Sequence, residues 1–391
     1  MTQSSTSRTA PEASLARLRD WFVQDALPLW AAEGYDEAGG GFYEALHFDG
    51  RPFTGRPRRV RTQARQIHTF SQASLRGWRN GAEALAAEGF EHFLSRACPD
   101  HGARGCVHRL DDEGAVIDDR RDLYDQAFLL LACASRWEAA QDERALKLAD
   151  KTIAFLDSEL AAPQGGWRES DQGELPRRQN PHMHLFEAFL ALYRVTGREE
   201  FLARAGQIRE LFARVFYGAE KGVIREFFDE DWRLQDKDQP VEPGHMLEWV
   251  WLLRAYDRAH DRTHDRTAGA DSGSVREKLY ARALALGADP GFFGFFDNKS
   301  PLTGGVHGAK RLWPQTEGFR AALVLGRRQE AAALADNLFM TYLAVETPGL
   351  WVDEFDAEGR PVAKDTPASI LYHLYEAVAE ADAVLSMGEA G

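Results

Sequence analysis

Two residues that could transfer protons lie at the start of an apolar segment, read as PVEPGHMLEWVWLLRAY over residues 240–256. Pro243 and Gly244 interrupt the preceding segment, and the apolar run after them predicts a buried helix. His245 and Glu248 would share a face of its first turn, where unpaired N–H groups lower the pKa of an imidazole and favour a carboxylate. Such a pair could exchange protons near neutral pH, although a capping carboxylate beside a core histidine would give the same sequence.

The composition excludes several classes of function. The chain has 391 residues and a formal net charge of −14, which disfavours binding to nucleic acid or to an anionic membrane surface. A hydrophobic content of 44% supports a sizeable core. The ten tryptophans are typical of a sugar- or ligand-binding hollow, but also of a packed interior.

The sequence predicts a cytoplasmic protein without a metal. No apolar run approaches the ~18 residues of a transmembrane helix, and residues 1–13 resemble a flexible tail rather than a signal peptide. Three cysteines make no disulfide framework. Cys98, His101, Cys106 and His108 are close together, but their spacing matches no common structural zinc pattern.

A glycine-led segment with aromatic and acidic residues recurs along the chain. Each copy alternates around a turn that carries Asp, Gly or Asn, which predicts a small β-hairpin or extended loop. A fixed recurrence of this kind is typical of repeat architectures. The copies begin at Gly39, Arg104, Gly165, Gly222, Gly291 and Gly349.

Two kinds of helix lie between these copies. Amphipathic helices, with apolar residues at i, i+3 and i+4, are predicted at Ser14–Trp30, Ala82–Ala97, Trp137–Leu160, Glu199–Phe216, Val275–Leu286 and Arg328–Val345. More apolar helices follow the hairpins and begin near Arg61, Leu123, Pro181, Pro243, Trp313 and Pro367. The polar segment Asp257–Glu277 is predicted to be a long surface connection.

The predicted fold is an all-α (α/α)6 barrel that forms a single domain over residues 14–391. Two-helix units cannot bury their apolar faces alone and must stack. Six units can close into a ring with the more apolar helices inside, and an open superhelix is the alternative. All hairpins enter the N-terminal ends of the inner helices, so the first turns of these helices would meet on one face. Helix capping explains the carboxylates there but not the histidines.

Five motifs in order carry a family resemblance. They are RTQARQ with Arg61, NPHMHLFEA with Asn180 and His184, PGHMLEW with His245 and Glu248, WPQTE with Trp313 and Glu317, and PASILYH with His373. On these motifs the chain resembles the N-acylglucosamine 2-epimerase superfamily, and within it the aldose–ketose isomerases of mannose or sulfoquinovose. The resemblance implies an (α/α)6 barrel that acts on a monosaccharide with two histidines and no cofactor.

The resemblance also implies roles for individual residues. His373 would take the C2 proton and return it to C1, through a cis-enediol. His245, oriented by Glu248, would open the sugar ring and move protons among the oxygens. Arg61 and His184 would bind O1 and O2 and stabilise negative charge. The other matched positions would hold the sugar hydroxyls and ring face, and these are Tyr124, Asn180, Trp313 and Glu317.

The substrate is less well defined. We expect D-mannose and D-fructose first, whereas two histidines acting on opposite faces of C2 would give 2-epimerisation of mannose, glucose or an N-acylglucosamine. Residues 56–65 contain five arginines, which could hold the phosphate or sulfonate of a charged hexose. The same run is also typical of a solvated turn followed by helix packing, which we favour because only Arg61 matches the motif.

Other classes of protein would use the same residues differently. A glycoside hydrolase would need two carboxylates across the sugar, and Glu248 and Glu317 are the best pair. A metal-dependent isomerase could use His182, His184 and His245 together with Glu248. A non-catalytic scaffold would need none of them. The sequence does not decide the oligomeric state.

Overall fold

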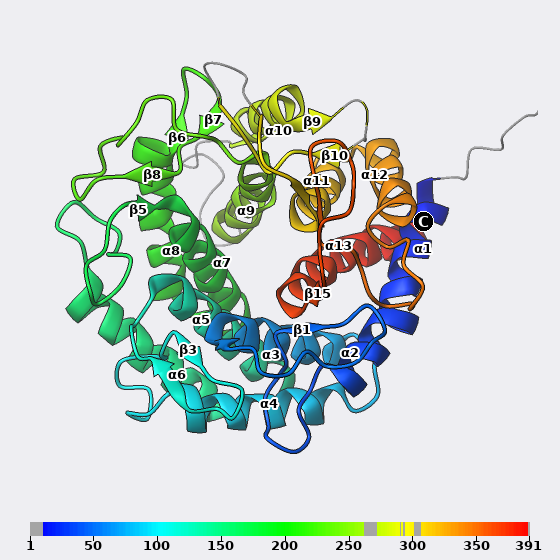
Figure 1. Cartoon of the computed structure of the whole chain (residues 1–391). Helices are drawn as coiled ribbons and strands as arrows, with labels where there is room; N and C mark the ends of the chain where they lie inside the picture. Colours follow the sequence, from blue (N-terminus) through cyan, green and yellow to red (C-terminus); the bar gives the residue numbers. More distant parts are fainter. Residues whose placement is uncertain (1–10, 262–271, 290, 292–293, 301–305, 390–391) are drawn as a thin grey trace, which may run out of the picture.

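Helices form two concentric rings in the computed structural model, which describes residues 11–261, 272–289, 291, 294–300 and 306–389 (Figure 1). The inner ring consists of α3 (Val60–Leu75), α5 (Leu123–Ala140), α7 (Gln179–Thr196), α9 (Pro243–Asp261), α11 (Leu312–Val324) and α13 (Leu371–Glu389). Each inner helix packs on the next, and α13 packs on α3. The ring is therefore closed, and the predicted (α/α)6 barrel is confirmed.

The outer ring covers the inner one with helices that bury one face. It consists of α1 (Pro11–Trp21), the π-helix η1 (Phe22–Ala26), α2 (Leu27–Glu33), α4 (Ala82–Ala97), α6 (Glu143–Phe155) with η2 (Leu156–Leu160), α8 (Glu199–Leu211) with η3 (Phe212–Phe216), α10 (Gly273–Gly287) and α12 (Arg328–Met340). Each of α4, α6, α8, α10 and α12 packs on the inner helix that precedes it in the chain, and α1 packs on α13. The sequential helix pair is thus the repeating unit.

Two predicted helix boundaries were wrong. The helix expected at Trp137–Leu160 is divided, because α5 continues to Ala140 and Gln141 then takes a left-handed conformation with φ of 53°. Asp142 starts α6, since its side chain accepts a hydrogen bond from the backbone N–H of Arg144. The helix expected to reach Val345 ends at Met340.

Other predicted boundaries fall partly on residues outside the described part. The first helix begins at Pro11, inside the expected tail, of which residues 1–10 are not described. Within the expected surface connection 257–277, α9 continues to Asp261 and α10 begins at Gly273, while residues 262–271 lie outside the described part. In the hairpin expected at Gly291, residues 292–293 are likewise outside it.

Short strands join neighbouring units. The chain just before each inner helix pairs antiparallel with the connection of the next unit, and the last unit pairs with the first. The pairs are β2 (Arg58–Arg59) with β3 (Arg109–Leu110), β5 (Arg177–Arg178) with β8 (Phe227–Phe228), β13 (Lys310–Arg311) with β14 (Glu354–Phe355), β15 (Thr366–Pro367) with β1 (Ala45–Leu46), and the single bridges Asp122–Ser170 and Val241–Lys299. These pairings satisfy backbone groups that two-residue strands could not satisfy alone.

Short hairpins within one unit, as predicted, accompany these pairings between units. Local antiparallel pairs join β3 to β4 (Val116–Asp118), β6 (Tyr217–Gly218) to β7 (Val223–Ile224), β9 (Ala288–Asp289) to β10 (Gly294–Phe295), and β11 (Asn298–Lys299) to β12 (Val306–His307). In the first and last units, the local antiparallel bridges Leu46–Pro52 and Phe355–Pro361 close the turns, while β1, β14 and β15 also pair across unit boundaries.

The hydrophobic core lies in the inner ring of helices and in the layer between the two rings. Every residue of α9 from Pro243 to Leu253 is buried, as expected for a helix surrounded by others. Trp30 and Trp351 stack with ring centroids 5.1 Å apart, and the Trp30 indole donates to the carbonyl of Gly349. These contacts join the N-terminal and C-terminal units. Within the described residues, no helix combines the length and apolar character needed to cross a membrane.

Candidate active site

The first two turns of the inner helices carry all the predicted site residues. Since strands and bridges hold these helix starts at one end of the barrel, side chains from distant parts of the sequence share that end. The residues are Arg61 on α3, Tyr124 on α5, Asn180 and His184 on α7, His245 and Glu248 on α9, Trp313 and Glu317 on α11, and His373 on α13.

One position of the repeated connection supplies a polar residue beside each helix start. In most copies its carbonyl accepts the first backbone N–H of an inner helix, as Glu226 does from Gln179 at 3.1 Å. The equivalent residues are Glu44, His108, Glu169, Glu226, Asp297 and Asp353. Glu44, Glu169 and Asp297 each bind the side chain of an arginine, whereas Glu226 binds a histidine.

That histidine is His245, which lies between two carboxylates. Its Nδ1 is 3.0 Å from Oε2 of Glu226, and its Nε2 is 3.7 Å from Oε2 of Glu242. Burial disfavours the charged ring, but the negative charges of Glu226 and Glu242 outweigh burial and raise the pKa of His245 to about 10. The side chain is therefore an imidazolium at neutral pH. The prediction that Glu248 orients His245 was wrong, because Glu226 does so.

His373 has the opposite charge state. Its Nδ1 is 2.9 Å from Oε1 of Glu317, whose other oxygen accepts a hydrogen bond from the Trp251 indole at 3.2 Å. Burial lowers the pKa of His373 well below its usual value, and the positive charge of Arg65 adds to this effect. His373 is thus neutral near pH 7. With Glu317 ionised, Nδ1 carries the proton and the lone pair on Nε2 can accept one.

Trp313 brings the two histidines to one place. Its ring centroid is 5.2 Å from that of His245 and 5.8 Å from that of His373. The tryptophan is 8% exposed, so its ring is mostly covered by the residues around it. An imidazolium and a neutral imidazole therefore flank one aromatic side chain, which is an arrangement suited to acid–base chemistry on a small molecule.

His184 belongs to a second cluster near the histidine pair. Its Nδ1 is 3.0 Å from Oε2 of Glu187, and its Nε2 is 3.4 Å from the Tyr124 hydroxyl and 3.7 Å from Oε1 of Glu248. Burial lowers the pKa of His184 well below its usual value, and burial raises the pKa of Glu248 well above its own. Oε1 of Glu248 has no hydrogen-bond partner among the described residues. The cluster therefore offers neutral polar groups to a ligand.

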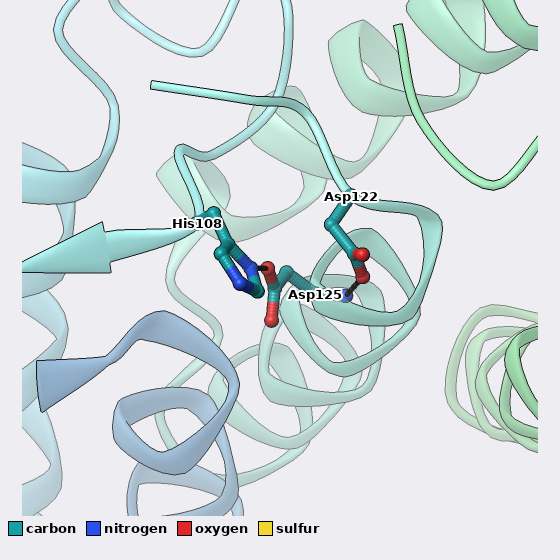
Figure 2. A group of neighbouring side chains, drawn as sticks. All are labelled: His108, Asp122 and Asp125. Carbon is teal, nitrogen blue, oxygen red and sulfur yellow. Dashed lines mark hydrogen bonds and ion pairs between the residues drawn. The ribbon is translucent and has the colours of Figure 1, made fainter. Parts of the chain in front are cut away.

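Arg61 is held at the rim by a carboxylate that also binds a histidine. Its guanidinium donates to Oδ1 of Asp125 at 3.1 Å, and Oδ2 of Asp125 is 2.6 Å from Nδ1 of His108 (Figure 2). Asp122 lies beside this group and accepts the backbone N–H groups of Tyr124 and Asp125 as the cap of α5. Burial opposes the charge of Arg61, but Asp125, Tyr124 and Asp122 together outweigh burial and raise the arginine pKa. Arg61 is thus a fixed cation.

The basic run 56–65 is held mainly by protein carboxylates. Arg61 aside, Arg56 pairs with Asp365 and Arg59 with Glu44, while Arg58 is 1% exposed between Asp36 and Asp112. Arg65 donates to the Tyr124 hydroxyl at 2.9 Å and to the carbonyl of Ser369. The run therefore serves helix packing and loop fixation.

Asn180 and His182 share a helix turn but differ in their contacts. Oδ1 of Asn180 is buried and has no hydrogen-bond partner within the described residues, so it can accept a bond from a ligand. Nε2 of His182 accepts the backbone N–H of Trp167 at 3.0 Å, and its Nδ1 is 3.1 Å from the carbonyl of Arg178. Because both ring nitrogens are engaged, His182 is a structural residue rather than a ligand for a metal.

Among the described residues, three groups of side chains have the composition of a metal site, and two of them already bind or contain a cation. They are His108, Asp122 and Asp125; His184, Glu187 and Glu248; and Glu226, Glu242 and His245. The first group binds Arg61, and the last holds an imidazolium, which is not a ligand. Cys98 and Cys106 from the cysteine–histidine cluster are buried, and burial raises the pKa of both thiols, to about 12 for Cys98.

Several residues of the site were missed from the sequence. Glu226 and Glu242 bind His245, Trp251 binds Glu317, and Glu187 binds both His184 and the Tyr372 hydroxyl. A signal existed for Glu226, because it occupies the same repeat position as Glu44 and Glu169. Glu187 and Trp251 fall in the apolar part of their helices, where no pattern distinguishes them from core residues.

Comparison with known proteins decides the family. The model of the family described as N-acylglucosamine 2-epimerase (GlcNAc 2-epimerase) matches residues 41–377. The chain belongs to this family. The match spans five inner helices and the first turns of α13, and so includes every residue of the site described above.

Individual relatives include isomerases and an epimerase. The chain is 36% identical over 379 residues to a mannose-6-phosphate isomerase of Rhizobium meliloti (strain 1021), with coverage of 93% of this chain and 95% of the relative. It is 28% identical to a D-mannose isomerase of Thermobifida fusca, covering 80% and 81%. The structure of cellobiose 2-epimerase from Bacillus thermoamylovorans B4167 superposes with a TM-score of 0.84 at 18% identity, covering 95% and 99%, and shares the fold. The chain is therefore an enzyme of the sugar isomerase and epimerase class.

Proposed function

We propose that this protein is an aldose–ketose isomerase that interconverts D-mannose and D-fructose through a cis-enediol. The observation that carries the proposal is that His245, bound by Glu226, and His373, bound by Glu317, both pack against Trp313. Isomerisation needs a base for the C2 proton and an acid for the sugar oxygens at the same time. Groups whose environments separate their pKa values provide both at one pH.

Each proton has a defined path in this reaction. The imidazolium of His245 protonates the ring oxygen as the pyranose opens and takes back the proton of the O1 hydroxyl, which leaves an aldehyde. Neutral His373 then removes the C2 proton while O1 gains one, which gives the cis-enediol. His373 returns its proton to C1 as O2 loses its own, and the ketose results. His245 exchanges the oxygen protons, and the net change moves one proton from C2 to C1 and one from O2 to O1.

The rest of the site holds the sugar and stabilises charge. The fixed cation of Arg61 and the neutral ring of His184 would bind O1 and O2, where negative charge develops. Oδ1 of Asn180 can accept a hydroxyl, and the ring of Trp313 offers an apolar face to the sugar. Tyr124 is bound by both Arg65 and His184, which supports a place for its hydroxyl at the edge of the same site.

A phosphorylated hexose is the second candidate substrate. The relative named mannose-6-phosphate isomerase supports it. The free sugar is favoured because Arg56, Arg58 and Arg59 are bound by carboxylates, so these guanidinium groups are not available as an open phosphate clamp. Epimerisation at C2 would use the same two histidines with a different sugar pose, and the fold shared with cellobiose 2-epimerase supports it as an alternative reaction.

Hydrolysis is supported less well. Glu317 is bound to His373 and to Trp251, and Glu248 lies beside His184, so both carboxylates serve histidines. Burial raises the pKa of Glu317 to about 7 and that of Glu248 well above its usual value. A retaining hydrolase needs two carboxyl groups that face the glycosidic bond, whereas these two face histidines.

A product assay tests the proposal directly. Purified protein is incubated with mannose, mannose 6-phosphate, glucose and cellobiose, each with and without EDTA, and the products are separated by carbohydrate chromatography. We expect fructose from mannose at a rate unchanged by EDTA. Glucose as the main product from mannose would establish an epimerase, and a strong preference for mannose 6-phosphate would establish the second substrate. Restoration of an EDTA-sensitive activity by a divalent ion would contradict the histidine mechanism.

A further inference from the structure

The barrel has a cavity at the end opposite the hairpins. It has a volume of about 510 Å³ and is lined by later turns of the inner helices, with Gln72, Leu190, Arg254, Val324 and Ala379 among its residues. The candidate catalytic residues occupy the first two turns of the same helices. The cavity therefore lies behind the candidate site along the barrel, and we call it the basal chamber.

The charged lining of the basal chamber is rich in guanidinium groups. Two of its carboxylates are fully engaged, because Glu187 binds His184 and Tyr372, and Glu376 binds His68 and Arg320. The lining arginines are Arg76, Arg194, Arg254, Arg258 and Arg320, and its third carboxylate is Glu380.

Two of the arginines lack a carboxylate partner. Arg76 pairs with Asp382 and Arg194 with Glu138, both from outside the lining. Arg254 donates to the backbone carbonyl of Val324, and Arg258 has no hydrogen-bond or ion-pair partner among the described residues. Arg320, which is 7% exposed, also has an Nε without a hydrogen-bond partner in the described part of the chain.

The position of Arg254 is not explained by helix stability. A cation in the last turn of a helix offsets the helix dipole, and this accounts for Arg258. Arg254 lies one turn earlier and faces Arg258 at i, i+4, where like charges destabilise a helix. Burial lowers the pKa of Arg254, and the charge of Arg258 lowers it further. An anion between the two side chains would offset both effects.

We propose that the basal chamber is a regulatory site for a small phosphate-bearing anion, held by Arg254 and Arg258. Two guanidinium forks on one helix face match the oxygens of a phosphate group. The buried N–H of Arg320 provides a further donor at the inner end. The volume lies within the range of small-molecule sites.

The same chamber touches the partners of the catalytic candidates. Trp251 lines it and donates to Glu317, which holds His373. Glu187 lines it and holds His184. The guanidinium of Arg320 lies 3.5 Å from the centre of the Trp251 ring. An occupant that moves Arg320 or Trp251 therefore acts on Glu317, and through it on the base of the reaction.

Calorimetric titration with inorganic phosphate, at constant ionic strength, tests the site. The variant Arg254→Gln/Arg258→Gln removes the two arginines that lack a carboxylate partner. The matched control Arg144→Gln/Arg204→Gln removes two arginines of the outer helices, which pair with Glu91 and Asp157. We expect saturable binding to the wild type and the control, and binding weakened about tenfold or more in the first variant, because hydrogen bonds to charged groups contribute this much to affinity.

Three results would overturn the proposal. They are absence of saturable binding to the wild type, equal binding by the two double variants, and loss of binding in Arg61→Gln, which would place the phosphate in the active site. The regulatory role rests on the proposed isomerase activity, and it requires that phosphate change kcat for mannose in the wild type but not in Arg254→Gln/Arg258→Gln. Binding without a change in kcat would refute that role. Failure of the protein to isomerise mannose would leave the calorimetric result unaffected.

Discussion

Replacement of Glu226 by glutamine should change the pH range of catalysis rather than the fold. Oε2 of Glu226 is 3.0 Å from Nδ1 of His245, and both residues are buried, at 3% and 4% exposure. Glutamine has nearly the same shape and can still accept the hydrogen bond, but it removes the negative charge. The imidazolium of His245 would keep only the attraction of Glu242, whose oxygen is 3.7 Å from Nε2.

The expected shift can be worked from the distance. Two unit charges 3.0 Å apart attract by about 5 kcal/mol at an effective dielectric constant of ~20, which would correspond to roughly 4 pKa units. Reorganisation reduces this, and an opposite charge at such a distance usually shifts a pKa by about 1–3 units. Because Glu226 raises the pKa of His245, which lies at about 10, the variant should lose the imidazolium at a pH lower by roughly 2 units.

The assay is kcat for fructose formation from mannose measured across the pH range. The alkaline limb, where activity falls as His245 loses its proton, should move to lower pH in Glu226→Gln, and the titration of the His245 ring measured by NMR should move with it. Glu44→Gln is the matched control, since Glu44 occupies the same repeat position but binds Arg59. An unchanged alkaline limb in Glu226→Gln would refute the assignment of His245 as the acid.

Two further predictions concern His373 and the buried ion pair between Glu376 and Arg320. His373→Ala should lose ~10²–10⁴-fold in kcat with little change in Tm, and near-normal turnover of this variant would refute the two-histidine mechanism. When the wild-type enzyme turns over in D2O, deuterium should appear at C1 of the ketose. Burial raises the pKa of Glu376, but Arg320, His68 and Arg76 together outweigh burial and lower the pKa to about 2 from 4.5. This carboxylate therefore stabilises the fold above about pH 4.5 and loses that contribution as the pH falls toward 2. In urea titrations, the stability gap between wild type and Glu376→Gln should therefore narrow by ~3 kcal/mol over that interval, and a gap independent of pH would contradict it.

The architecture could be predicted because its signal is repeated. Six copies of a glycine-led connection, each followed by an apolar helix, constrain the fold far more than any single helix pattern, and a closed ring follows from burying every apolar face. The pairing between connections could not be predicted. Strands of two residues carry no alternation to detect, and the partners Ala45 and Pro367 stand at opposite ends of the chain.

The candidate site, like the fold, could be predicted only in part. Residues in the motifs, such as His245, Glu317 and His373, could be named because they stand in recognisable order at helix starts. The partners that set their charges could not, since Glu226 lies in a connection and Trp251 in an apolar run. The mistaken pairing of His245 with Glu248 shows the limit, because residues that share a helix face still turn to whichever buried group is closest in three dimensions.

The charge difference between the two histidines can be traced to one repeat position. In the fourth unit the connection residue Glu226 reaches its own inner helix and binds His245. The corresponding residue of the sixth unit is Asp353, whose Oδ1 has no hydrogen-bond partner within the described residues, and burial raises its pKa to about 7. His373 instead contacts Glu317 from the neighbouring helix α11. Burial disfavours the negative charge of Glu317, and the positive charge of Arg320 offsets it. One scaffold therefore places the two histidines in different electrostatic surroundings, because the equivalent carboxylate contacts the histidine in only one of the two units.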